Sequence, residues 1–186
     1  TLLILDEIQP GIGRTGKLFA FEHYNVIPDI LVYGKGLGGG FPIGAISCSK
    51  KIMNSFKENP ILGHITTFGG HPVIAAAAYA NVKEIFETKI MSKVEEKEKL
   101  FKNYLKHPLI KEIRGKGLML ALILENKKIA NNLVIKCLEK GLILFYLLFE
   151  SKAVRITPPL TIKKSEIKKG CKIIIETLNQ INNSVH

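Results

Sequence analysis

Two short apolar runs, each ending in a charged side chain, constrain the fold of this chain more than any other feature. Residues 1–6 (TLLILD) end in Asp6, and residues 29–35 (DILVYGK) end in Lys35. Continuous apolar runs of this length, rich in Leu and Ile, are typical of buried parallel strands. We therefore expect an α/β fold with Asp6 and Lys35 at the ends of two adjacent strands. Open α/β sheets bind their ligands at that edge.

The remaining patterns predict helices and further strands in two parts. Residues 44–49 predict a weaker third strand, and residues 71–90 predict a long helix with Pro72 near its first turn. Strands that alternate with loops and a helix indicate an α/β layer domain over residues 1–90. We expect the boundary near residues 86–92, with a small α+β domain over residues 91–186.

The sequence of residues 91–186 predicts three helices and four strands. The helices are expected over 91–107, 127–141 and 163–183. The strands are expected as a pair around a glycine turn in 110–125, and then over 142–149 and 153–159. Strands bracketed by helices in this way indicate the α+β class.

Composition and charge argue against several classes of protein. The formal net charge is +11, but the lysines are scattered and lie beside glutamates at helical spacing. We therefore expect solvated helix faces and no nucleic-acid partner. The longest apolar runs fall short of the ~20 residues that cross a bilayer, and we expect no signal peptide. Three distant cysteines have no metal-ligand spacing, so we expect no metal site and a reducing, cytoplasmic setting.

The glycines of residues 11–17 (GIGRTGK) match two nucleotide-binding patterns, and both fit poorly. A phosphate-binding loop needs Ser or Thr after its lysine, and Leu18 stands there. A dinucleotide-binding loop needs its glycines to open a helix directly after the strand. Residues 7–10 intervene here, and Pro10 favours a turn.

A carboxylate and a lysine at adjacent strand ends suggest pyridoxal phosphate. In such sites, the lysine forms a Schiff base with the cofactor and an acid holds its pyridine nitrogen protonated. The glycine-rich residues 36–45 that follow Lys35 allow other groups to approach closely. From the pattern alone, a structural ion pair between Asp6 and Lys35 explains the residues equally well.

Five segments, in the same order along the chain, resemble the class III aminotransferases, which are pyridoxal-phosphate enzymes of fold type I. The first two look like the family's segments for the aspartate and the Schiff-base lysine. The third looks like its phosphate-contacting loop, and the last two like signatures of its C-terminal domain. These segments are residues 2–30, 34–45 (GKGLGGGFPIGA), 66–72 (TTFGGHP), 112–120 (EIRGKGLML) and 154–162 (VRITPPLTI).

The resemblance implies a cofactor role for five residues. Lys35 would hold pyridoxal phosphate covalently, and Asp6 would pair with its pyridine nitrogen. Ile8 would pack on one face of the ring, and Gln9 would bond its phenolic oxygen. Thr67 would contact the phosphate across a dimer interface.

The resemblance also implies a reaction and partners. The family transfers an amino group, often a terminal one, from donors such as acetylornithine, ornithine or 4-aminobutyrate to 2-oxoglutarate. Arg155 would bind a substrate carboxylate, for which a planar guanidinium is suited. We expect a homodimer with shared active sites.

The chain resembles only the second half of these enzymes, and it begins with Thr1 inside an expected strand. We therefore expect a fragment of a longer enzyme. Residues 1–90 would be the C-terminal part of the large cofactor-binding domain, and residues 91–186 the small domain. The alternatives are an inactive truncated fragment, or a lyase, aminomutase or racemase that uses the same cofactor and fold.

Overall fold

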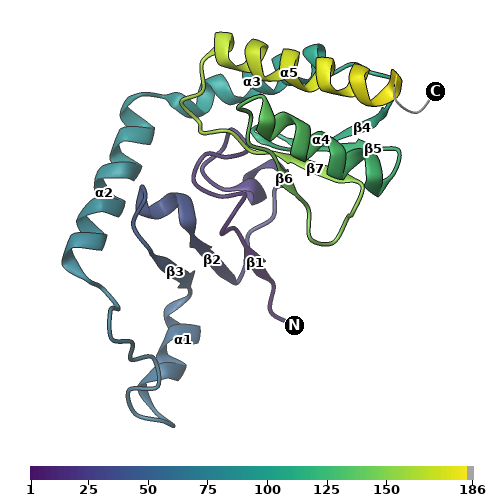
Figure 1. Ribbon diagram of the computed structural model, residues 1–186. Coiled ribbons are helices and arrows are strands. Elements are labelled where there is room, and N and C mark those ends of the chain that lie inside the picture. The colour runs from purple at the N-terminus through teal and green to yellow at the C-terminus, as the bar shows by residue number, and fades with distance from the viewer. Residues whose placement is uncertain (184–186) are drawn as a thin grey trace. The chain divides into compact units, whose positions relative to one another are not determined.

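The computed structural model describes residues 1–183, which divide into two compact units (Figure 1). The first unit is Thr1–Met91, and the second begins at Ser92. Helices and sheets occur in both units, so the α/β class expected from the sequence is confirmed. The assignment of these units to the large and small domains of a longer enzyme stays a prediction.

The first unit contains a sheet of three strands, in the order β1-β2-β3. They are β1 (Ile4–Asp6), β2 (Ile30–Gly34) and β3 (Gly44–Cys48). β1 and β2 run parallel, whereas β3 is antiparallel to β2. All three predicted strands are confirmed, and the parallel pair brings Asp6 opposite Val32.

The connection from β1 to β2 consists of turns and a single 3-10 helix, η1 (Ala20–His23). Gly13 and Gly16 adopt positive φ angles of 86° and 93° in these turns, where L side chains are disfavoured. The glycines therefore shape a turn and do not open a helix. A dinucleotide-binding loop is excluded at this position, as the sequence indicates.

Short helical turns and one long helix follow β2. The turns are η2 (Lys35–Gly38), α1 (Lys50–Met53), η3 (Asn54–Lys57) and η4 (Ile90–Lys93). The long helix is α2 (Pro72–Glu87), which packs against η2. Pro72 occupies the first turn of α2, where a missing N–H is tolerated. The predicted helix is thus confirmed, whereas α1 and η3 are not predicted from the sequence.

The second unit is an antiparallel sheet in the order β4-β5-β7-β6, with three helices. The helix α5 packs against α3 and α4, and α4 contacts β5, β6 and β7 (Figure 1). The elements are α3 (Val94–Tyr104), β4 (Ile110–Lys116), β5 (Met119–Leu124), α4 (Lys127–Glu139), β6 (Phe145–Tyr146), β7 (Ala153–Ile156) and α5 (Lys164–Asn183). None of the helices among residues 1–183 combines the length and apolar character of a membrane span.

The core of the second unit lies between the helices and the sheet. Its fully buried side chains come from most of its elements, so burial of apolar area holds the layers together. They include Val94, Leu118, Leu122, Leu133, Val154, Ile167 and Leu178. The three predicted helices are confirmed. One of them ends as the sequence indicates, with Gly141 at φ 78° after α4.

One strand prediction is largely wrong. The apolar run 142–149 predicts a full strand, but only Phe145–Tyr146 pair with β7. Leu148 and Phe149 are 87% and 101% exposed. β-propensity reflects how side chains fit a half-buried pleated surface. Leu142 and Leu144 pack at the core, but Ile143, Phe145 and Tyr146 are also exposed, so the apolar composition overstates the strand.

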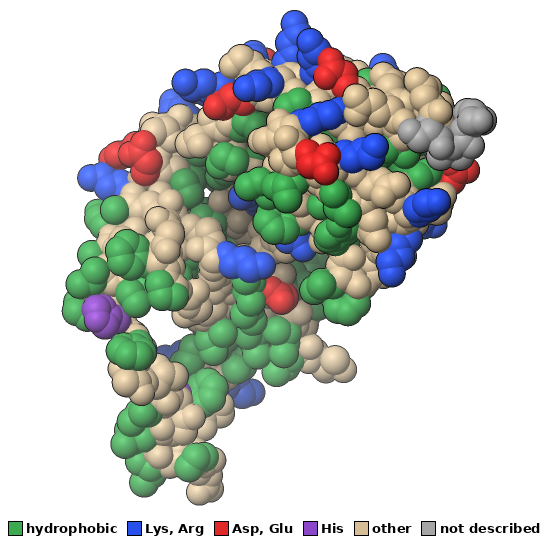
Figure 2. All heavy atoms as spheres, viewed as in Figure 1, with side chains coloured by type: hydrophobic (Ala, Val, Ile, Leu, Met, Phe, Trp, Pro, Cys, Tyr) green, Lys and Arg blue, Asp and Glu red, His purple; other side chains and the backbone are tan. Residues whose placement is uncertain are grey.

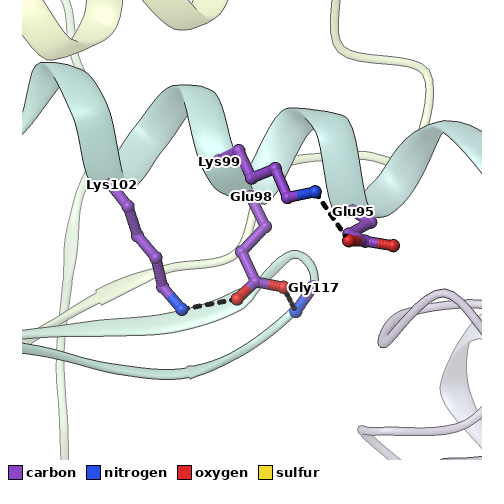
Figure 3. Close-up of polar contacts among 5 residues, drawn as sticks. All are labelled: Glu95, Glu98, Lys99, Lys102 and Gly117. Carbon is purple, nitrogen blue, oxygen red and sulfur yellow. Dashed lines mark hydrogen bonds and ion pairs between the residues drawn. The ribbon is translucent and has the colours of Figure 1, made fainter.

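The hairpin of β4 and β5 is fixed by a carboxylate from α3 (Figure 3). Oε2 of Glu98 accepts a hydrogen bond of 2.6 Å from the backbone N–H of Gly117, and Oε1 accepts one of 2.5 Å from Nζ of Lys102. Gly115 adopts φ 117°, and a Cβ there would lie 2.0 Å from the carbonyl oxygen of Met119. This position near the end of β4 therefore needs glycine, and Glu98 ties the following turn at Gly117 to the helix.

Candidate functional site

Asp6 and Lys35 lie at one edge of the first sheet. Asp6 is the last residue of β1 and is opposite Val32 in the parallel strand β2. Lys35 follows Gly34, which ends β2. Asp6 and Lys35 are both exposed residues. The predicted arrangement of an acid and an amine at adjacent strand ends is therefore present. The chemical roles of the two residues stay predictions.

The backbone of Lys35 is strained. Its φ angle is 43°, in the left-handed region that residues other than glycine seldom adopt. Such a conformation costs about 1–3 kcal/mol and persists only where the surroundings impose it, which is common at functional sites. The strand before it also ends tightly, since a Cβ at Gly34 would lie 2.7 Å from the carbonyl oxygen of Ile43.

The glycine segment 11–17 supports the lysine turn from one side. Ile12 has a φ of 56° and is 5% exposed. A Cβ added to Gly36 would lie 3.4 Å from Cβ of Ile12, which is ordinary van der Waals contact. The two segments therefore pack directly together, next to Lys35. This packing gives the glycine-rich segment a structural role in place of the rejected nucleotide-binding ones.

The turn after β1 is organised by two acids. Oδ1 of Asp6 accepts a hydrogen bond of 2.9 Å from the backbone N–H of Ile8, which forms an Asx turn. The side chain of Glu7 is buried, and its two oxygens accept hydrogen bonds from the N–H groups of Ala20 and Phe21, at 2.9 and 2.8 Å. These contacts fix the backbone that carries Ile8 and Gln9.

A cavity of about 830 Å³ opens beside the lysine turn. Ile8, Lys35 and Thr66 contribute to its lining, and most of the remaining lining groups are apolar. Its size lies within the range of cofactor and small-molecule pockets. Two of the predicted cofactor residues, Ile8 and Lys35, are thus brought to one cavity.

Thr67 lines a neighbouring cavity of about 640 Å³, with Gly69, Gly70 and His71 just before α2. The two cavities share Ile43, Gly44 and Thr66. Gln9 is half-buried in the turn after β1 and lines neither of these two cavities. The described part of the first unit therefore groups Lys35, Ile8 and Thr67 around adjoining cavities, with Asp6 at the same sheet edge as Lys35.

Arg155 belongs to β7 of the second unit, where it is opposite Ala121 on β5 and Phe145 on β6. It lines a cavity of about 160 Å³ together with Thr157 and Glu166. Its buried Nε atom has no hydrogen-bond partner among the described residues. A guanidinium with an unused buried donor is suited to bind an anionic group, but its role stays a prediction.

Two residues near the site are missed by sequence reasoning. Glu7 stands between Asp6 and Ile8, and nothing in the sequence around it indicates that it accepts hydrogen bonds from the first residues of η1. Asn81 lies in the Ala-rich helix α2, and its amide nitrogen contacts the carbonyl oxygens of Gly36 and Leu37. The only signal in the sequence is an asparagine, a poor helix former, in the middle of a strong helix.

Comparison with known proteins identifies the family. The model of the family described as aminotransferase class-III matches residues 1–178. The chain therefore belongs to the class-III aminotransferases. Its fold is also that of solved members, as expected from the resemblance.

The similar proteins carry related names. The chain is 43% identical to acetylornithine aminotransferase of Caldanaerobacter subterraneus subsp. tengcongensis, over 97% of this chain and 45% of that protein. It is 40% identical to acetylornithine aminotransferase of Aquifex aeolicus, over 95% of this chain and 45% of that protein. The chain thus spans about 45% of the length of these curated relatives.

Two solved structures show the same fold. The ornithine aminotransferase of Toxoplasma gondii, crystallised with oxidised glutathione, is 33% identical with a TM-score of 0.88, over 99% of this chain and 44% of that one. Its active site is described as partially occupied by pyridoxal phosphate. Acetylornithine aminotransferase of Elizabethkingia anophelis is 35% identical with a TM-score of 0.87, over 97% of this chain and 46% of that one.

Proposed function

We propose that the whole protein that carries this chain is a pyridoxal-phosphate-dependent aminotransferase. The observation that carries the proposal is Lys35, held in a strained conformation at the end of β2, beside the strand that ends in Asp6. Strain of this kind is common at functional sites. Membership of the class-III family supports the same conclusion.

The residues at this edge suit the proposed cofactor. Lys35 supplies an amine for covalent attachment, and Asp6 supplies a carboxylate for the pyridine nitrogen. Ile8 offers an apolar surface at the cavity that Lys35 also lines. We assign Gln9 to the phenolic oxygen and Thr67 to the phosphate. When bound, the cofactor supplies an electron sink for the substrate's reacting carbon.

The protein's own groups would handle binding and proton transfer. Asp6 keeps its carboxylate oriented through the Asx turn to Ile8, so a cationic partner meets a fixed acceptor. Nζ of Lys35, once free of the covalent bond, would move the proton at the substrate's reacting carbon. Proton transfer by a positioned amine of this kind is a recognised form of general acid–base catalysis.

We also propose the substrates and the assembly. Relatives named acetylornithine and ornithine aminotransferases support an amino donor with a terminal amino group, and we assign 2-oxoglutarate as acceptor. The unused donor of Arg155 supports a carboxylate-binding role. We propose a homodimer with shared active sites. Free Cys48, Cys137 and Cys171 support a reducing compartment, for which we propose the cytoplasm.

Substitutions of Lys35 and Asp6 in the whole protein test the proposal. Lys35→Ala should lose the borohydride-reducible lysine adduct and nearly all turnover, because no other amine takes its place. Asp6→Asn should keep the shape and bind cofactor, but a neutral partner stabilises a cationic ring nitrogen less. We expect kcat to fall by roughly a hundredfold or more, which is ~3 kcal/mol.

The measurement combines steady-state kinetics with peptide mapping after borohydride reduction. Lys17→Ala is a matched control, since Lys17 is an exposed lysine of the same unit, and it should retain both the adduct and turnover. An adduct on Lys17 or Lys50, or normal turnover in Asp6→Asn, would overturn the site assignment.

A further inference from the structure

The turn that carries Lys35 is tied to α2 by a side chain from a distant part of the sequence. Nδ2 of Asn81 donates hydrogen bonds to the carbonyl oxygens of Gly36, at 2.6 Å, and Leu37, at 3.2 Å. These are the two residues directly after the lysine. Both partners are acceptors only, so the amide group must present its NH₂ side to them.

The hydrogen bonds from Asn81 restrain the backbone directly after Lys35, whose own conformation is strained. Lys35 has a φ of 43°, a conformation that relaxes unless neighbouring groups impose it. At the end of η2, the N–H of Gly39 reaches the carbonyl oxygen of Gly36 at 3.4 Å, a long and weak hydrogen bond. The two bonds from Asn81 are both shorter than this one, and they add to the backbone bonding of the turn.

The helix and the turn also fit closely in space. Gly39 has a φ of 58°, and a Cβ there would lie 2.9 Å from Cβ of Asn81. Glycine at this position lets α2 approach until the amide reaches the carbonyl groups. Ile12 also packs against Gly36. The lysine turn is thus in contact with both Asn81 and Ile12.

We propose that Asn81 is a positioning residue for Lys35, because its amide holds the two carbonyl groups that follow the lysine and so maintains its strained backbone. This inference rests on the function proposed above. It assigns a role in presenting the lysine amine to Asn81, which lies 45 positions along the chain from Gly36, the residue that follows the lysine.

The test uses pyridoxal phosphate itself as the probe on the cofactor-free whole protein. Borohydride traps the lysine adduct at set times, and peptide mapping gives the labelling rate at Lys35 and at every other lysine. Asn81→Asp keeps the side-chain shape, but it replaces the donor with a carboxylate that faces two carbonyl oxygens. We expect labelling at Lys35 to slow by at least about fivefold, the effect of losing one or two neutral hydrogen bonds.

A second readout follows the turn without the cofactor. Amide hydrogen exchange at Gly39 and Phe41, whose N–H groups bond to Gly36 and Gly38, should become faster in Asn81→Asp. Asn81→Ala removes the donor without adding charge and should act in the same direction. Gly39→Ala keeps the amide but forces the turn and α2 apart, so it should also slow labelling at Lys35.

Asn132→Asp is the matched control, since Asn132 lies in the interior of α4 in the other unit and the substitution makes the same charge change. It should leave the labelling rate at Lys35 and the exchange of the turn unchanged. Wild-type labelling of Lys35 in both Asn81→Asp and Asn81→Ala would overturn the inference alone. Equal slowing at all lysines would also overturn it, because the effect would then be general. If mapping of the wild-type protein finds the pyridoxal-phosphate adduct on a lysine other than Lys35, the proposed function and this inference are both wrong.

Discussion

Burial changes the chemistry of Cys171 in α5, which is 1% exposed in the core of the second unit. Desolvation disfavours the thiolate and raises the pKa of this thiol to about 12. A cysteine in an unfolded chain has a pKa of about 8.5. Above that pH, the unfolded chain releases the proton while the folded protein keeps it. The contribution of Cys171 to stability is therefore fully present below pH ~8.5 and is lost as the pH rises toward the folded value.

We predict that the free energy of unfolding of the whole protein falls by about 1–2 kcal/mol between pH 8 and pH 10 through Cys171. Urea unfolding at both pH values measures this fall, and Cys171→Ala should remove that part of it. Leu178→Ala, a cavity-forming change at another buried position of α5, should lower stability at both pH values by the same amount. An unaltered pH dependence in Cys171→Ala would contradict the prediction.

The residues of the site differ in how far the sequence predicts them. Asp6 and Lys35 could be placed together because parallel strands bring their carboxyl ends to one edge. Asn81 and Ile12 could not, because their contacts with the lysine turn join segments that are distant in the chain. Such contacts depend on where distant segments pack against each other, and the periodicity of the sequence does not predict that packing.

At the scale of elements, Glu98 joins α3 to the hairpin of β4 and β5 (Figure 3). Its side chain is 15% exposed, and the N–H of Gly117 belongs to a buried residue. Glu98→Ala would leave that N–H without its acceptor, which costs about 1–3 kcal/mol. We predict that amide hydrogen exchange at Gly117 becomes at least about tenfold faster, since 1.4 kcal/mol corresponds to a factor of ten.

Glu95→Ala is the matched control on the same helix. Glu95 pairs with Lys99 at 2.8 Å, but both side chains are more than two-thirds exposed. This pairing lowers the pKa of Glu95 and raises that of Lys99, yet solvent screens such surface pairs. Exchange at Gly117 should therefore stay close to the wild-type rate. Equal acceleration in the two variants would show that the hairpin responds to α3 in general and not to the carboxylate of Glu98.

Elements with strong local signals could be predicted from the sequence. Pro72 marks the start of α2, and Gly117 marks the tight turn between β4 and β5. The structure of the run 142–149 could not be predicted, because an apolar composition indicates that side chains are to be buried but not which element they pack against. Residues 50–71 carry no clear period, and their short turns α1 and η3 are correspondingly not predicted.

At the scale of the whole molecule, the first unit exposes apolar side chains around the proposed phosphate-binding Thr67. The apolar side chains belong to residues 61–68. Figure 2 shows hydrophobic side chains at the lower end of the view. Ile61, Leu62, Ile65 and Phe68 are 79%, 58%, 65% and 73% exposed. Clustered exposure of this kind is expected where another part of the whole protein or another subunit covers the surface. It supports the proposal that this segment lies against another subunit in the whole protein.

The proposed shared site makes a prediction about mixed dimers. If Thr67 serves the partner subunit's cofactor, a dimer of one Lys35→Ala subunit and one Thr67→Ala subunit contains one intact site. That site combines Lys35 of the second subunit with Thr67 of the first. The Lys35→Ala homodimer lacks the lysine in both sites, and the Thr67→Ala homodimer lacks the phosphate contact in both sites. We therefore expect hybrid dimers to regain activity at a cofactor concentration that does not saturate Thr67→Ala, whose loss of a phosphate contact should weaken binding about fivefold to tenfold.

The control mixes Lys35→Ala with Asp6→Asn. Both residues belong to the same edge of the same sheet, so each subunit supplies both of them to one site. No arrangement of those two subunits restores a complete site, and activity should stay at the level of Asp6→Asn alone. Tagged subunits purified in two steps isolate the hybrids, so activity is measured per hybrid dimer. Hybrids of Lys35→Ala and Thr67→Ala that show no gain would place Thr67 in its own subunit's site or outside the site altogether, and the shared arrangement would then be wrong.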